Sequence, residues 1–388
     1  MCLYILTHVL FFHLNSAHHQ TERNGDYETA VQCLQDSLVG RQKHLDEMDP
    51  EIADNLALLG HVYSKQSEYD QAVTVFSDCL KIREATRDGT DTASLLIADA
   101  LFDLGTALQK VLDTQRSMQL FTDALKEYQR HLPDPNDVKI AQCNSCIGEI
   151  HEKTNDLPKA VSSLETAARI YESHIGPDPS EKEIKASKSS TDMYSGQAET
   201  LFRLATAKDR LGEEAAALKQ YRRAMRLYKA LFGRDSLFVA KILNRLANMK
   251  GRDGSVDKAM VLFDESLRIR MLHLGNNHED VAETLFGMGI VFEKRRDYGA
   301  AMKAYSDCLR IRSSKFGSDS MEVAQVVVNI GVVRGNKGDF SGALKSWNKA
   351  LSIYRKHGLG DSDALVIRLL EHQRLANQLK RRTTKNMH

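Results

Sequence analysis

Small and hydrophobic residues return along this chain at a spacing of 42 residues. The stretch "VAKILNRLAN" begins at 239, "VAETLFGMGI" at 281 and "VAQVVVNIGV" at 323. Within each stretch the apolar positions lie three and four residues apart, as on one face of an α-helix, and the polar positions share the opposite face. Related stretches begin at 52, 97, 140 and 197. This pattern predicts an array of helical repeats rather than one compact core.

Each repeat contains a second apolar stretch, for example "DKAMVLFDESLRIR" and "GAAMKAYSDCLRIR". The turns before such stretches, "SEYD", "RRDY" and "KGDF", are polar and short, which predicts an antiparallel helix pair. We number the first alanine of each repeat as position 1. The residues at positions 8 and 20 are then small and the residue at position 24 is large, so the two helices can approach closely. The position-1 residues are Ala53, Ala98, Ala141, Ala198, Ala240, Ala282 and Ala324, with spacings of 45, 43, 57, 42, 42 and 42 residues.

This pattern resembles the tetratricopeptide repeat. The 42-residue length, the "VAETL" start and the linker "CLRIRSSKFGSDSMEVA" are most similar to the kinesin-light-chain type of that repeat. The resemblance implies an all-α, right-handed superhelical solenoid of antiparallel helix pairs. It covers nearly the whole chain.

The repeat pattern also predicts how the chain is divided. We expect an N-terminal repeat at 1–48, repeats one to three at 49–176, a flexible insertion at 177–196, repeats four to seven at 197–364, and a capping helix with a basic tail at 365–388. Whether the N-terminal repeat is complete is left open by the pattern. The insertion is rich in Ser, Lys and Pro and offers little to bury. The apolar start, residues 1–17, could be read as a secretory signal, but the repeat pattern favours a structural helix there.

Charge and cysteine content set the broad class. The chain has 53 Lys and Arg against 52 Asp and Glu, a net charge of +1, so no overall charge argument favours nucleic acid or a membrane. The six cysteines are scattered, which is typical of free thiols in a reducing compartment. We therefore expect a cytoplasmic protein.

No motif of the sequence points to catalysis. "CNSC" at 143–146 has a redox or zinc spacing, but it lacks a second Cys or His pair nearby. "GMG" at 287–289 lacks the strand and the third glycine of a phosphate-binding loop, and Gly289 already occupies position 8. We predict no enzyme activity, no cofactor and no metal site.

The resemblance implies a binding surface, because positions 2, 5, 6 and 9 of the first helices line the concave groove in this family. Asparagine side chains there can satisfy a peptide backbone, phenylalanines can hold apolar side chains, and cations can hold a carboxylate. The candidate peptide-binding residues are Phe202, Arg203, Lys241, Asn244, Arg245, Asn248, Phe286 and Asn329.

The predicted function is a non-catalytic scaffold or adaptor that binds short peptide segments of partner proteins, with some acidic character. A kinesin-light-chain-like cargo adaptor is one alternative, and a helical-repeat nucleic-acid binder is another. A nucleic-acid binder would need a continuous basic inner wall, whereas acidic residues such as Glu149, Glu199 and Glu283 interrupt it. We expect no small-molecule substrate and no membrane-spanning segment.

Overall fold

The computed structural model describes residues 24–177, 179–186 and 191–385. The chain divides into two compact units. Unit 1 contains residues 1–180 and 189–213, and unit 2 contains 181–188 and 214–388. In both units the secondary structure of the described residues is α-helical, which confirms the predicted all-α repeat solenoid.

Unit 1 is a stack of helix pairs. The first helices α3, α5 and α7 pair with the second helices α4, α6 and α8, and each second helix also packs on the first helix that follows it. This order continues to α10, which packs on α8 and α7. The helices are α2 (Asn24–Gln42), α3 (Pro50–Lys65), α4 (Tyr69–Ala85), α5 (Asp91–Lys110), α6 (Thr114–His131), α7 (Val138–Lys153), α8 (Leu157–Ile175) and α10 (Thr191–Arg210).

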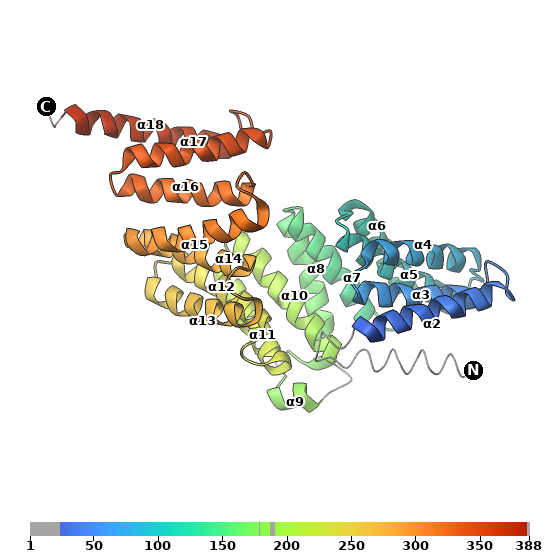
Figure 1. The fold of residues 1–388 in the computed structure, drawn as a ribbon. Helices are drawn as coiled ribbons and strands as arrows, with labels where there is room; N and C mark the ends of the chain where they lie inside the picture. The colour runs from blue at the N-terminus through green and yellow to red at the C-terminus, as the bar shows by residue number, and fades with distance from the viewer. Residues whose placement is uncertain (1–23, 178, 187–190, 386–388) are drawn as a thin grey trace. The chain divides into compact units, whose positions relative to one another are not determined.

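Unit 2 repeats this arrangement. The first helices α12, α14 and α16 pair with α13, α15 and α17, and α18 packs on α17 at the C-terminal end of the stack (Figure 1). Successive first helices also touch, α12 with α14 and α14 with α16. The helices are α9 (Glu181–Ala186), α11 (Glu214–Phe232), α12 (Leu237–Arg252), α13 (Val256–Leu274), α14 (Glu279–Lys294), α15 (Tyr298–Phe316), α16 (Met321–Asn336), α17 (Phe340–Lys356) and α18 (Ala364–Lys385).

The core of each pair follows the predicted positions. All seven position-1 alanines and all seven small residues at position 20 are fully buried. A Cβ on Gly289 would lie 2.5 Å from Cε1 of Tyr305, and one on Gly60 would lie 2.5 Å from Cε1 of Phe76. Because real Cβ atoms do not approach so closely, glycine is required at position 8 of these two repeats, whereas Ala205 and Ala247 occupy it opposite Tyr221 and Phe263.

The turn inside each pair needs a left-handed residue at position 15. Glycine occupies this position at Gly212, Gly254 and Gly338, whereas Leu112 has a φ of 66° there. Leucine rarely adopts this conformation, because its Cβ crowds the backbone carbonyl. The turn in the second repeat therefore carries backbone strain.

Arginines at position 31 join neighbouring repeats. In each case Nη1 of the arginine donates to a backbone oxygen. Arg83 donates to that of Leu96 at 2.8 Å, Arg270 to that of Asp280 at 2.5 Å, and Arg312 to that of Glu322 at 3.3 Å. The three acceptors share one repeat position, two residues before the next position-1 alanine. The same bond therefore links a second helix to the following first helix once in unit 1 and twice in unit 2.

The predicted insertion is partly helical. Within 177–196, residues 181–186 form α9, which packs on α11, and α10 begins at Thr191. Ile184 and Tyr194 are both buried. The sequence argument overlooked these two side chains, which give the segment an apolar surface to bury. The helix predicted over residues 1–17 lies outside the described residues.

Candidate functional site

Six of the eight predicted peptide-binding residues belong to unit 2. They lie on α12, α14 and α16, and we refer to the side of the stack formed by these three helices as the first-helix face. Lys241 is exposed, Arg245, Asn248, Phe286 and Asn329 are half-buried, and Asn244 is buried. Phe202 and Arg203 belong to α10 of unit 1 and are described separately.

Glu283 links two arginines on the first-helix face. Its Oε2 accepts from Nη2 of Arg270 at 3.0 Å, and its Oε1 lies 3.9 Å from Nη2 of Arg245. Arg270 comes from α13 and is 3% exposed, so the carboxylate reaches a buried guanidinium as well as one at the surface. One negative charge thus lies between two positive ones, and Lys241 lies one turn before Arg245 on the same helix.

Glu283 was expected on the inner wall, whereas Arg270 was not predicted as part of this arrangement. A comparison of position 31 across the repeats gives a signal, because it is arginine in three repeats and tyrosine in the others. These residues are Arg83, Tyr128, Tyr171, Tyr228, Arg270, Arg312 and Tyr354.

Asn244 does not reach the surface as expected. It is 1% exposed, and its Oδ1 has no hydrogen-bond partner within the described part of the chain. Its backbone oxygen accepts from Nδ2 of Asn248 at 2.9 Å. Asn248 in turn lies against α14, since its Oδ1 would be 3.2 Å from a Cβ on Gly287. Asn248 is therefore the asparagine of this pair that a ligand can reach.

Phe286 and Asn329 occupy the next two repeats of the first-helix face. The Phe286 ring lies 5.8 Å from that of Tyr305, and the Arg312 guanidinium lies 5.2 Å from its centroid. These contacts hold the ring in place while it remains partly accessible. Asn329 donates from Nδ2 to the backbone oxygen of Gln325 at 3.2 Å. The face thus changes from basic on α12 to partly apolar on α14.

In unit 1, Arg203 is surrounded by carboxylates. Its Nε lies 2.8 Å from Glu199, its Nη2 3.0 Å from Glu149 and its Nη1 3.6 Å from Glu152. Burial by itself would raise the pKa of Glu149, but Arg203, Lys153 and Lys110 together outweigh it and the pKa is lowered. Phe202 beside it is buried. Arg203 is therefore committed to internal ion pairs, contrary to the role expected for it.

Unit 1 also contains a partly buried acid that was not singled out from the sequence. Asp103 on α5 lies 3.3 Å from Nε2 of His61 on α3. Burial and the nearby Asp99 carboxylate raise the pKa of Asp103 to about 7, and burial lowers the pKa of His61. Asp99 itself accepts from Tyr128 and from Lys139 at 2.6 Å each. Because the pKa of Asp103 is raised and that of His61 is lowered, the two groups do not form a full ion pair near neutral pH.

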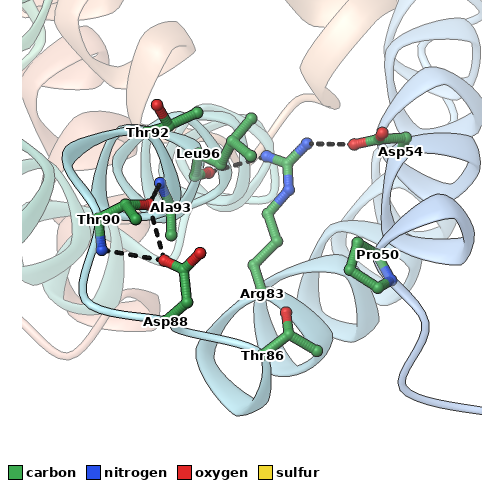
Figure 2. Close-up of a pocket in the computed structure, with 9 residues that line it drawn as sticks. All are labelled: Pro50, Asp54, Arg83, Thr86, Asp88, Thr90, Thr92, Ala93 and Leu96. Atoms are coloured by element: carbon green, nitrogen blue, oxygen red, sulfur yellow. Dashed lines mark hydrogen bonds and ion pairs between the residues drawn. The ribbon is translucent and has the colours of Figure 1, made fainter.

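A pocket opens between α3, α4 and α5 of unit 1, with a volume of about 250 Å³ (Figure 2). Arg83 stands in its centre between Asp54 and the Leu96 backbone oxygen, and Asp88 binds the amide and hydroxyl of Thr90 at its rim. The 45-residue spacing before Ala98 explains the pocket. It lengthens α5 to 20 residues, compared with 16 for α3, and the added turn forms one wall.

The two cysteines of "CNSC" lie in surroundings that disfavour the thiolate form. Burial raises the pKa of the Cys146 thiol to about 12 and that of Cys143 well above its ordinary value, so both sulfurs stay protonated. Over the described residues, no group of three or more His, Cys, Asp or Glu is arranged to hold a metal ion. No helix in the part of the chain that the structure covers is long and apolar enough to cross a membrane.

Comparison with known protein families finds the tetratricopeptide repeat at residues 56–90, 198–237 and 238–314. Two curated proteins are similar over part of the chain. The RxLR effector protein SFI4 of Phytophthora infestans is 23% identical over 156 residues, which are 40% of this chain and 45% of the effector. Protein kinesin light chain-related 2 of Arabidopsis thaliana is 24% identical over 152 residues, 39% of this chain and 22% of that protein. The chain thus spans less than half the length of these relatives.

Solved structures share the fold. BtubC (BKLC) from P. vanneervenii has a TM-score of 0.50 at 20% identity and covers 65% of this chain and 94% of its own. Aspartyl phosphate phosphatase F from Bacillus subtilis has a TM-score of 0.57 at 13% identity, and the match covers 90% of this chain and 88% of the phosphatase chain. A signal-transduction ATPase with a tetratricopeptide-repeat sensor from Pyrococcus horikoshii has a TM-score of 0.60 at 10% identity, and the match covers 91% of this chain and 47% of the ATPase chain.

Proposed function

Because this chain is a tetratricopeptide-repeat protein similar to kinesin light chains, we propose that it is a non-catalytic scaffold that binds short peptide segments of other proteins. The proposed site is the first-helix face of unit 2. The observation that carries it is the cationic pair on α12, Lys241 and Arg245, next to an arginine-bound Glu283. A carboxylate of the peptide binds this pair.

The other residues of the face have separate roles in the proposal. The Asn248 amide binds the peptide backbone, the accessible part of the Phe286 ring holds an apolar side chain, and Asn329 extends the polar contacts to the next repeat. Asn244 supports α12 from below the surface. Arg203 and Phe202 take no part in this site, since Arg203 is paired with three carboxylates of unit 1.

The cysteines at 33, 79, 143, 146 and 308 are free thiols, which fits a reducing compartment such as the cytoplasm. A cargo adaptor is the narrower version of the same function, and the similarity to a kinesin light chain-related protein supports it. Glu283 on the first-helix face opposes the alternative of a nucleic-acid binder.

The test is a peptide-array screen with the full chain, followed by titration of the best acidic peptides. We expect dissociation constants of about 1–10 μM, because ordering the peptide offsets part of the contact energy. The Lys241→Ala/Arg245→Ala variant should bind at least about tenfold more weakly, since each charge-assisted bond contributes about 1.5–3 kcal/mol. Phe286→Ala should weaken the binding of peptides that carry an apolar residue and leave the binding of purely acidic peptides unchanged.

A matched control removes two positive charges from another part of unit 2. The Lys303→Ala/Lys345→Ala variant removes two exposed lysines from the second helices of unit 2 and should bind the same peptides as the unaltered chain. Equal losses in both double variants would indicate a general charge effect and contradict the proposed site. Equal binding by the Lys241→Ala/Arg245→Ala variant and the unaltered chain would also overturn it.

A further inference from the structure

Helix α11 carries much more positive charge than the rest of the chain. Its 19 residues contain five basic side chains and one acidic side chain, whereas the whole chain has a net charge of +1. The exposed members are spaced three, four and three residues apart, which places them on one side of the helix. These members are Lys219, Arg222, Arg226 and Lys229. All of them point away from the buried face, which contains Ala217, Tyr221, Ala224 and Tyr228.

Two further second helices of unit 2 share this bias. Helix α15 contains four basic residues and one acidic residue, although Arg312 among them is buried and pairs with Glu279, and α17 contains four basic residues and no acidic one. Lys303 and Lys345 are exposed and follow Lys219 at intervals of 84 and 126 residues, which are two and three repeat lengths. Equal repeat positions lie on one side of a stacked array. In unit 1 the second helices α4, α6 and α8 have nearly balanced charge.

The remaining second helix, α13, has equal numbers of basic and acidic residues, but it exposes aliphatic side chains. Val261 is 68% exposed and Leu272 is 65% exposed. Val261 occupies the repeat position that holds Lys219, Lys303 and Lys345 in the other helices. We call the exposed sides of α11, α13, α15 and α17 the outer face of unit 2. It combines a basic surround with large apolar side chains on one helix.

We propose that the outer face of unit 2 binds the surface of an anionic lipid bilayer. Basic side chains gain about 1 kcal/mol each near such a surface, and aliphatic side chains gain further by entering the interfacial layer. Nucleic acid is the weaker candidate, because Val261 and Leu272 offer nothing to phosphates. Three aromatic rings of this unit also pack on one another and not on a nucleic-acid base, since Phe238 is stacked on Tyr228 at 4.7 Å and lies 5.1 Å from Phe232. The contact is peripheral and separate from the first-helix face.

The experiment is flotation of the full chain with vesicles of phosphatidylcholine, alone or with about three-tenths phosphatidylserine. We expect binding to the anionic vesicles only, weakened by raising NaCl from about 0.1 M to about 0.5 M. The Lys219→Glu/Arg222→Glu/Lys229→Glu variant should bind roughly a hundredfold more weakly, from about 1 kcal/mol for each of three cations. Val261→Ser/Leu272→Ser should weaken binding at both salt concentrations, because the apolar contribution is not screened.

A charge-matched control reverses three exposed cations of unit 1 second helices, Lys81→Glu/Lys159→Glu/Arg169→Glu, and should bind like the unaltered chain. Circular dichroism melting confirms that each variant is folded. Equal binding to neutral and anionic vesicles would overturn the proposal, as would equal losses in the two charge-reversal variants. Binding to a short DNA or RNA duplex without binding to anionic vesicles would overturn it in favour of nucleic acid.

Discussion

Arg270 donates from Nη1 to the hydroxyl of Thr284 at 2.8 Å, and this bond joins two neighbouring repeats of unit 2. The same guanidinium also binds the Asp280 backbone oxygen and the Glu283 carboxylate. A buried guanidinium with three partners on the next first helix fixes the distance and rotation between the repeats. It also holds Glu283 next to Arg245, so the repeat interface shapes the first-helix face.

Replacement of Arg270 should therefore destabilise unit 2. We expect Arg270→Met to lower the free energy of unfolding by about 2–4 kcal/mol, because the acceptors on α14 lose their donor inside the protein. Arg268→Met is the matched control. Arg268 is half exposed and pairs with Asp235 and Glu265, so its loss should cost less than about 1 kcal/mol. Urea denaturation measures both values, and equal values would contradict the role assigned to Arg270.

The raised pKa of Asp103 predicts a dependence of stability on pH. Between pH values of about 4 and about 7 the folded state keeps a proton on this carboxyl that the unfolded state has lost. The free energy of unfolding should therefore fall as the pH rises through this window, by roughly 1–3 kcal/mol. Asp103→Asn should remove this slope and raise stability at pH values of about 8.

His61 contributes the opposite slope, since its lowered pKa costs stability as the pH falls below about 6.5. The comparison is therefore made between His61→Gln and His61→Gln/Asp103→Asn, with thermal melting at several pH values. Parallel stability curves for the two variants would contradict the raised pKa.

The strained turn at Leu112 predicts a stabilising substitution. Leu112→Gly should raise the free energy of unfolding by about 0.5–1 kcal/mol, because glycine adopts the left-handed conformation without a Cβ clash. The side chain is 81% exposed, so little packing is lost. Val111→Gly, one residue earlier at a φ of −86°, should destabilise instead. A lower melting temperature for Leu112→Gly would refute the strain.

Two glycines of α16 predict opposite effects of one added methyl group. A Cβ on Gly331 would overlap the Trp347 indole, whereas one on Gly335 would have its nearest neighbour at 3.5 Å. Gly331→Ala should therefore cost about 1–3 kcal/mol by overpacking. Gly335→Ala should be neutral or should add up to about 1 kcal/mol through helix propensity. Melting temperatures that change in the same direction for both would contradict the close packing at position 8.

Much of the fold could be predicted from the sequence, because the scaffold positions are defined by spacing alone. The alanines at position 1 and the small residues at position 20 are buried wherever the 42-residue pattern places them. The turn at position 15 has the same conformation in glycine-containing and other repeats. The short helix α9 was not predicted, because a Ser-rich and Lys-rich composition hid the one buried isoleucine within it.

Helical periodicity alone predicts which helix faces belong to the scaffold and which residues can face a ligand. The burial and the partners of each candidate side chain become known only in the folded structure. Asn244 is buried and Arg203 is held by three carboxylates, while Lys241 remains exposed. The physical reason is that these outcomes depend on side chains from neighbouring repeats. Their approach is set by how closely the helices pack, which no single repeat encodes.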